Sequence, residues 1–233
     1  MTQIVPTITA ATPADFATQL ARLDFASRLH IDIADGDFAP ARTVNLDQIY
    51  WDNFRENLPG TPESTPREID LHLMLSEPIQ WLHQIVALNP RRAIFHVESD
   101  APRKNLPPIR EHLAKFGIKF GVAILPETRV ANVREIVALA DEVLIFGGKL
   151  GFQGGTADLK QLEKIAQIRE IWREVDEKNP AKILREIAWD GGANANNIRE
   201  IARAGVDVVN VGAAIARSGN PETAYRDLQN LVK

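Results

Sequence analysis

The sequence LHIDIA at residues 29–34 decides the fold class, because apolar and polar residues alternate in it without a break. Such alternation is typical of a β-strand, whose successive side chains point to opposite faces of a sheet. Leu29, Ile31 and Ile33 would then face a layer of helices, while His30 and Asp32 would share the opposite face. This strand therefore predicts a sheet that is covered by helices on one side and carries polar groups on the other.

Similar short runs recur along the whole chain, and each is followed by a longer segment with helical spacing. The candidate strands are residues 4–9, 28–33, 68–74, 92–96, 119–124, 142–145, 183–190 and 208–211. The clearest helix is predicted over residues 159–176, where aliphatic residues recur at three-residue steps. Alternating strands and helices are typical of a parallel sheet, and eight such units close a barrel. We therefore predict an α/β fold in which residues 1–233 form a single (β/α)₈ TIM barrel domain.

The composition favours an ordinary globular protein. Of the 233 residues, 45% are hydrophobic and 25% are charged, so a sizeable core can form. The net charge of −4 and the scattered basic residues argue against nucleic acid and anionic membranes as partners. The first residues, MTQIVPTITA, do not resemble a signal peptide, and no apolar run reaches 18 residues, so we expect a cytoplasmic protein. The absence of cysteine excludes disulfides and cysteine-bound zinc.

Polar residues with the same alternation occur on two further strands. In IDLHLM at residues 69–74 it places His72 inward, and in IAWD at residues 187–190 it places Asp190 inward at the end of the seventh strand. Burying several such groups is costly unless they pair or bind a cation. Imidazole and carboxylate together suit Zn²⁺, Fe²⁺, Mn²⁺ or Co²⁺. The predicted metal ligands are His30, Asp32, His72 and Asp190. Taken singly, each histidine could instead be a hydrogen-bonded core residue, and each aspartate could cap the following helix.

Glycines follow the last three candidate strands, at residues 151–155, 191–192 and 212. Backbone N–H groups at such positions can approach an anion closely, and many barrels bind phosphate after strands seven and eight. Two turn-rich stretches, residues 35–45 and 147–156, could close over a substrate or be long surface loops. We expect His96, at the end of the fourth strand, to have a structural role or to support the metal ligands.

Together these elements resemble the ribulose-phosphate 3-epimerase family. Its pattern H-x-D-x-x-D-G-x-F is matched at residues 30–38 and its H-L-M at residues 72–74, with PTI at 6–8 and DGG at 190–192 in the same order. The resemblance covers nearly the whole chain. It implies a metal-dependent isomerase that acts on a small phosphorylated ketose, such as ribulose 5-phosphate or a hexulose 6-phosphate. It also implies a homo-oligomer, since relatives commonly form dimers or hexamers.

The resemblance assigns roles residue by residue. It implies that the four predicted ligands bind the metal and that Asp32 and Asp190 also act as the acid/base pair. The residues implied to bind substrate and its phosphate are Thr7, His72, Met74, Gly154, Gly191, Gly192, Gly212 and Ala213.

The chain departs from the family pattern around the expected substrate. The family usually has methionine at the positions of Ala34 and Phe146, serine at that of Ala213, and the loop NPGFGGQ where residues 149–155 read KLGFQGG. We therefore expect a pocket of different shape, which favours a substrate other than the usual pentulose phosphate, such as one that is a carbon longer, and slower turnover of ribulose 5-phosphate than in ordinary family members. Two alternatives stay open: a catalytically silent sugar-phosphate-binding paralogue, and an aldol-type or decarboxylase barrel enzyme. Related decarboxylases have lysine at the position of Ala34, which argues against a decarboxylase. A silent binding protein would have no need of all four metal ligands, so their presence argues against that alternative.

Overall fold

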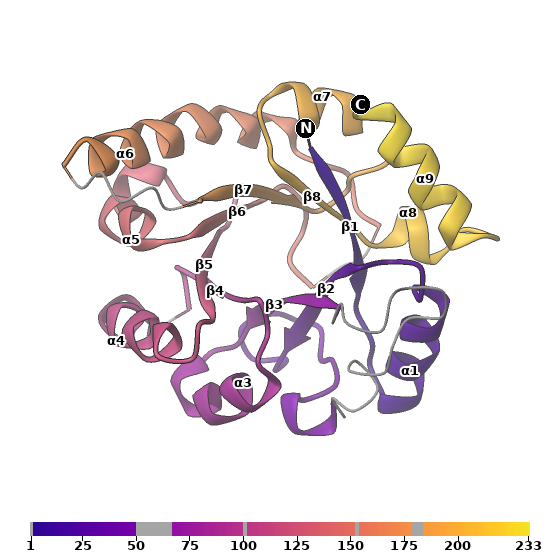
Figure 1. Ribbon diagram of the computed structural model, residues 1–233, viewed down its shortest axis with the longest axis horizontal. Helices are drawn as coiled ribbons and strands as arrows, with labels where there is room; N and C mark the ends of the chain where they lie inside the picture. The colour runs from indigo at the N-terminus through magenta and orange to yellow at the C-terminus, as the bar shows by residue number, and fades with distance from the viewer. Residues whose placement is uncertain (1, 50–66, 100–101, 152–153, 179–183) are drawn as a thin grey trace.

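Eight parallel strands form a closed barrel in the computed structural model, which describes residues 2–49, 67–99, 102–151, 154–178 and 184–233 (Figure 1). Each strand pairs with the next along the chain, and the last pairs with the first. The strands are β1 (Gln3–Ile8), β2 (Arg28–Ala34), β3 (Glu68–Met74), β4 (Arg92–His96), β5 (Lys119–Ile124), β6 (Glu142–Phe146), β7 (Glu186–Asp190) and β8 (Val208–Val211). The predicted TIM barrel is confirmed.

Helices follow the strands and surround the barrel (Figure 1). They are α1 (Pro13–Arg22), α3 (Leu82–Leu88), α4 (Pro102–Ala114), α5 (Arg134–Leu139), α6 (Lys164–Lys178), α7 (Ile198–Arg203), α8 (Ala213–Ala216) and α9 (Pro221–Leu231). Short 3₁₀ segments lie at η1 (Leu46–Gln48), η2 (Pro78–Trp81), η3 (Val130–Val133) and η4 (Leu159–Glu163). In the described ranges, no helix has the length and apolar character needed to cross a membrane.

Side-chain caps begin the first and last helices. The Thr12 side chain accepts a hydrogen bond from the backbone N–H of Asp15, and Asn220 accepts one from Thr223. In both helices the residue after the cap is proline. Proline suits the first helical position because a backbone N–H there would have no hydrogen-bond partner within the helix, so its absence costs nothing. These two helix starts therefore follow from local sequence.

The predicted strands match the observed ones to within a few residues. The first strand covers residues 3–8 instead of 4–9, and β2 and β6 each extend one residue further. The seventh begins at Glu186 instead of 183, a residue that lies outside the described ranges. The helix predicted over 159–176 starts as the 3₁₀ segment η4 and continues as α6 to Lys178.

Strand alternation separates the core into two layers. Leu29, Ile31 and Ile33 are buried between sheet and helices, where Trp189 also packs, as its position in the alternation predicts. Another apolar cluster, which includes Val5, fills the barrel interior. Because the interior is packed with side chains, the barrel is not a pore, and chemistry is confined to its ends.

Charged side chains close the amino-terminal end of the barrel. Arg28 donates from Nε to Asp70 Oδ2 at 2.7 Å, while Arg92 Nη1 lies 2.9 Å from Glu186 Oε2 and also contacts Glu142. Burial opposes the ionisation of Glu186, but the charges of Arg92 and Arg28 outweigh it and lower its pKa. These ion pairs stabilise the closed end, and the polar residues predicted to be functional lie at the opposite end.

Candidate active site

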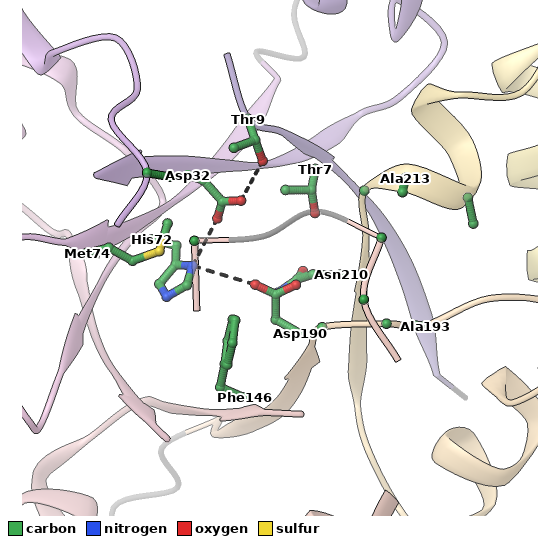
Figure 2. A pocket seen from close by; sticks show the side chains of 18 of the residues that line it. Thr7, Thr9, Asp32, His72, Met74, Phe146, Asp190, Ala193, Asn210 and Ala213 are labelled. Carbon is green, nitrogen blue, oxygen red and sulfur yellow. Dashed lines mark hydrogen bonds and ion pairs between the residues drawn. The ribbon is translucent and has the colours of Figure 1, made fainter. Parts of the chain in front are cut away.

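Four predicted ligands converge at the carboxyl end of the barrel. His30 and Asp32 come from β2, His72 from β3 and Asp190 from the end of β7, and one ligand atom from each lies within 4.8 Å of those of the others. Asp32 Oδ1 is 2.9 Å from His72 Nδ1 and 3.3 Å from His30 Nε2. Asp190 Oδ2 is 3.6 Å from His72 Nδ1 and 3.7 Å from His30 Nε2. Figure 2 shows Asp32 and Asp190 reaching His72 from different sides.

The hydrogen bonding of His30 fits a cation among these four residues. Its side chain is fully buried, yet neither ring nitrogen has a hydrogen-bond partner in the part of the chain that the structure describes. Buried polar groups are almost always paired, so the unpaired Nε2, which lies near both carboxylates, needs an explanation. A divalent cation held by one nitrogen from each histidine and one oxygen from each aspartate would satisfy His30 Nε2 and offset both carboxylates.

The site shifts the pKa values of its own groups. Burial opposes ionisation of Asp32, but the close approach of His30 and the hydrogen bond with His72 outweigh it and lower the pKa of Asp32. Burial and the charge of Asp32 raise the pKa of Asp190. Burial also opposes the protonation of His30, yet the two carboxylates outweigh it and raise its pKa. The two carboxylates therefore make the surroundings of His30 favourable to a positive charge.

A chain of hydrogen bonds supports His72 on the side of its ring that faces away from the two carboxylates. Its Nε2 lies 2.8 Å from His96 Nε2, and His96 Nδ1 lies 3.4 Å from Glu98 Oε2. Glu98 in turn accepts a hydrogen bond from the backbone N–H of Leu125 at 2.9 Å. Burial lowers the pKa of His96 to about 4, so its ring is neutral at pH 7. His96 therefore lies behind a predicted ligand, in the supporting position that we expected for it.

A cavity of about 300 Å³ opens above the cluster (Figure 2). Such a volume suits a small ligand. Every predicted site residue except His30, which lies beneath the floor, lines it: Thr7, Asp32, His72, Met74, Gly154, Asp190, Gly191, Gly192, Gly212 and Ala213. Ala34 and Phe146, where the family usually has methionine, also line it. The Phe146 ring centroid lies 6.2 Å from that of His72, so an aromatic wall stands beside the ligands.

The glycines after β7 allow two loops to pack closely. Gly191 and Gly192 have φ values of +102° and +70°, which L-residues with side chains rarely adopt. A Cβ atom on Gly191 would lie 2.3 Å from the backbone nitrogen of Gly148, and one on Gly192 would lie 2.4 Å from that of Ala157. Contact with the loop after β6 therefore explains both glycines even without a ligand.

Thr9, Asn210 and Arg217 are among the polar pocket residues that sequence reasoning missed. Thr9 donates a hydrogen bond from Oγ1 to Asp32 Oδ2 at 2.6 Å, Asn210 lines the pocket from β8, and Arg217 reaches it just after α8. The Arg217 guanidinium lies 3.0 Å from where a Cβ on Gly154 would be. Strand alternation could have revealed Thr9 and Asn210, because each lies two residues from a position, Thr7 or Gly212, that the resemblance assigns to the site. No sequence signal indicated Arg217.

Comparisons with known proteins agree on one family. The model of the ribulose-phosphate 3-epimerase family matches residues 3–216. A ribulose-phosphate 3-epimerase of Aquifex aeolicus is 31% identical over 208 residues, covering 89% of this chain and 85% of the relative. One of Mycobacterium tuberculosis is 29% identical over 226 residues, covering 97% and 91%.

Solved structures with the same fold are more distant in sequence. KGPDC from Streptococcus mutans superposes with a TM-score of 0.68 at 10% identity, covering all of this chain and 97% of the other. The 3-hexulose-6-phosphate synthase from Salmonella typhimurium gives 0.61 at 14% identity, covering 99% and 98%. At such low identity these structures support the barrel fold alone.

Proposed function

The chain belongs to the ribulose-phosphate 3-epimerase family of sugar-phosphate epimerases, and from this premise we propose that it is a metal-dependent 3-epimerase of a ketose phosphate. Its substrate would be ribulose 5-phosphate, converted to xylulose 5-phosphate, or a related hexulose 6-phosphate. The observation that carries the proposal is the convergence of His30, Asp32, His72 and Asp190 at the base of a cavity of about 300 Å³. We also propose that residues 1–233 form one domain.

Two carboxylates suit the chemistry of epimerisation. The reaction removes the proton from the carbon next to the ketone and returns a proton to the opposite face. Asp32 and Asp190 come from β2 and β7 and approach the centre of the site from different sides (Figure 2). One carboxylate would accept the proton while the other, protonated, would donate. Thr9 and His72 hold the Asp32 carboxylate by hydrogen bonds, which fixes its direction.

The four clustered side chains would hold a divalent cation, Zn²⁺, Fe²⁺, Mn²⁺ or Co²⁺. When bound, such a cation offsets the negative charge that develops on the ketone and hydroxyl oxygens of the substrate. The hydrogen-bond chain through His96 and Glu98 would orient the His72 ring for this role.

The other end of the cavity would hold the phosphate. We assign this role to backbone N–H groups of Gly154, Gly191, Gly192, Gly212 and Ala213, with the positive charge of Arg217 beside them. Ala213 offers no side-chain hydroxyl, and among the described residues that line the pocket Arg217 is the one arginine or lysine that could donate to the phosphate. Binding at a distance from the reacting carbon fixes the position of the substrate along the cavity. Thr7 and Met74 also line the cavity.

Deuterium exchange in D₂O tests the proposal. The protein would be incubated with ribulose 5-phosphate or allulose 6-phosphate, each with EDTA or with added Fe²⁺, Mn²⁺, Zn²⁺ or Co²⁺. We expect deuterium at C3 of at least one substrate, dependent on metal. Absence of exchange for both substrates with every metal would contradict an epimerase. Calorimetric binding of a sugar phosphate without any exchange would instead support a silent binding protein.

A further inference from the structure

Asn210 is the single polar residue of β8, whose sequence is VVNV. The residue is 2% exposed and lines the cavity. Among the residues that the structure describes, neither its Nδ2 nor its Oδ1 has a hydrogen-bond partner. A buried amide offers two donors and two acceptor lone pairs, and leaving all of them unused is unfavourable. A ligand in the cavity is the partner that its position allows.

Other asparagines near the site use their amides to hold the backbone. Asn194 and Asn197 both donate from Nδ2 to the carbonyl oxygen of Gly192 at 2.9 Å, which fixes the turn after β7. Asn210 makes no such bond, and its own strand pairs with β1 through the backbone. A purely structural role is therefore evident for the first two and lacking for Asn210.

The position of Asn210 lies between the two ends of the proposed site. In β8 it is two residues before Gly212, so both face the barrel interior. The pairing of Trp189 with Val209 places Asp190 and Asn210 next to each other on neighbouring strands, and Figure 2 shows their side chains together. Asn210 thus adjoins the carboxylate on one side and the proposed phosphate loop on the other.

We propose that Asn210 hydrogen-bonds the C4 hydroxyl of the substrate and so selects ketose phosphates that carry it. This inference rests on the proposed function. In such a substrate C3 reacts, and C4 is the next carbon toward the phosphate in pentuloses and hexuloses alike. A hydroxyl both donates and accepts, which matches the two unused groups of an amide. Thr7 Oγ1, which also lacks a partner in the described ranges, lies further along the neighbouring strand β1 and faces the same cavity.

The test compares ribulose 5-phosphate with its 4-deoxy analogue. For the natural protein we expect kcat/KM to fall about tenfold or more on the deoxy compound, because a buried amide then stays unpaired. Asn210→Leu keeps the branched shape of the side chain and removes the amide. It should lose about tenfold on ribulose 5-phosphate and treat the two compounds alike to within about twofold. Circular dichroism and a thermal melt would verify that this variant folds.

Thr43→Val is the matched control. Thr43 also lines the cavity, but its Oγ1 already bonds the backbone, accepting from Ala34 N–H at 2.9 Å and donating to Val44 O at 3.1 Å. Its substitution should leave the ratio between the two compounds unchanged. A natural protein that does not distinguish the compounds, or an Asn210→Leu variant that keeps the full preference, would overturn the proposal.

Calorimetry separates this inference from the proposed function. Binding of both compounds is measured on the EDTA-treated protein, where no turnover is needed. A preference for ribulose 5-phosphate that Asn210→Leu abolishes would support the hydroxyl contact even if no deuterium exchange occurred. Equal affinities for the two compounds, or no measurable binding of either, would count against it.

Discussion

Replacing His96 by Phe should weaken metal binding much more than it weakens the fold. A neutral imidazole carries one proton. If His72 Nδ1, which faces both carboxylates, binds a cation, its proton must be on Nε2. His72 Nε2 lies 2.8 Å from His96 Nε2, so His96 can accept a hydrogen bond from the Nε2–H of His72 while donating from its own Nδ1–H toward Glu98. The neutral state of His96, whose pKa burial lowers to about 4, allows this arrangement.

The magnitude follows from the partner that His72 loses. In the cation-bound variant its Nε2–H is left unpaired in a fully buried position, which costs about 1–3 kcal/mol. In the metal-free variant the proton can instead be on Nδ1 and bond Asp32 at 2.9 Å, so only an acceptor is left unpaired. Most of the cost therefore falls on metal binding. We expect affinity to fall about 10- to 100-fold, the usual effect of removing such a support.

A chelator competition titration with Zn²⁺ and Mn²⁺ gives the affinities, and thermal unfolding in EDTA gives the stability without metal. His96→Gln is the control, because its side-chain oxygen can still accept a hydrogen bond and should restore part of the affinity. Affinity of His96→Phe within about threefold of the natural protein would refute the reasoning. The reasoning would also be refuted if His96→Phe lowered the free energy of unfolding in EDTA by as much as it lowered the free energy of metal binding.

Three further predictions test other parts of the molecule. Asp190→Asn should reduce the epimerisation rate at least 100-fold, because an amide cannot exchange the proton, while calorimetric binding of the sugar phosphate persists. Glu186→Gln should cost about 2 kcal/mol or more at pH 7 in urea unfolding. Since the folded pKa of Glu186 is lowered, its contribution is present above pH 4.5 and should shrink as the pH falls below that value; a constant difference would contradict this. Ala34→Met combined with Phe146→Met should raise kcat/KM on ribulose 5-phosphate if the altered pocket shape disfavours it, and an unchanged value would show that these positions do not select the substrate.

Local sequence determined which side of the barrel each strand residue faces. The alternation in residues 29–34 assigned Leu29 and His30 to opposite faces, and the structure places the first among the helices and the second inside the barrel. The same rule placed Trp189 outward. This information is local because the pleat of a strand has a period of two residues whatever the strand pairs with. The strand bounds were predicted to within a few residues for the same reason.

Only the tertiary structure decided which polar groups touch. His96 could be placed at a strand end, but its contact with His72 depends on how β3 and β4 are shifted along each other. The unpaired amide of Asn210 depends on what β1 and β7 place beside it, and Arg217 enters the pocket only because the chain turns there after α8. Contacts of this kind join residues far apart in sequence. They are set by the closure of the barrel and by the strand register, which no local periodicity contains.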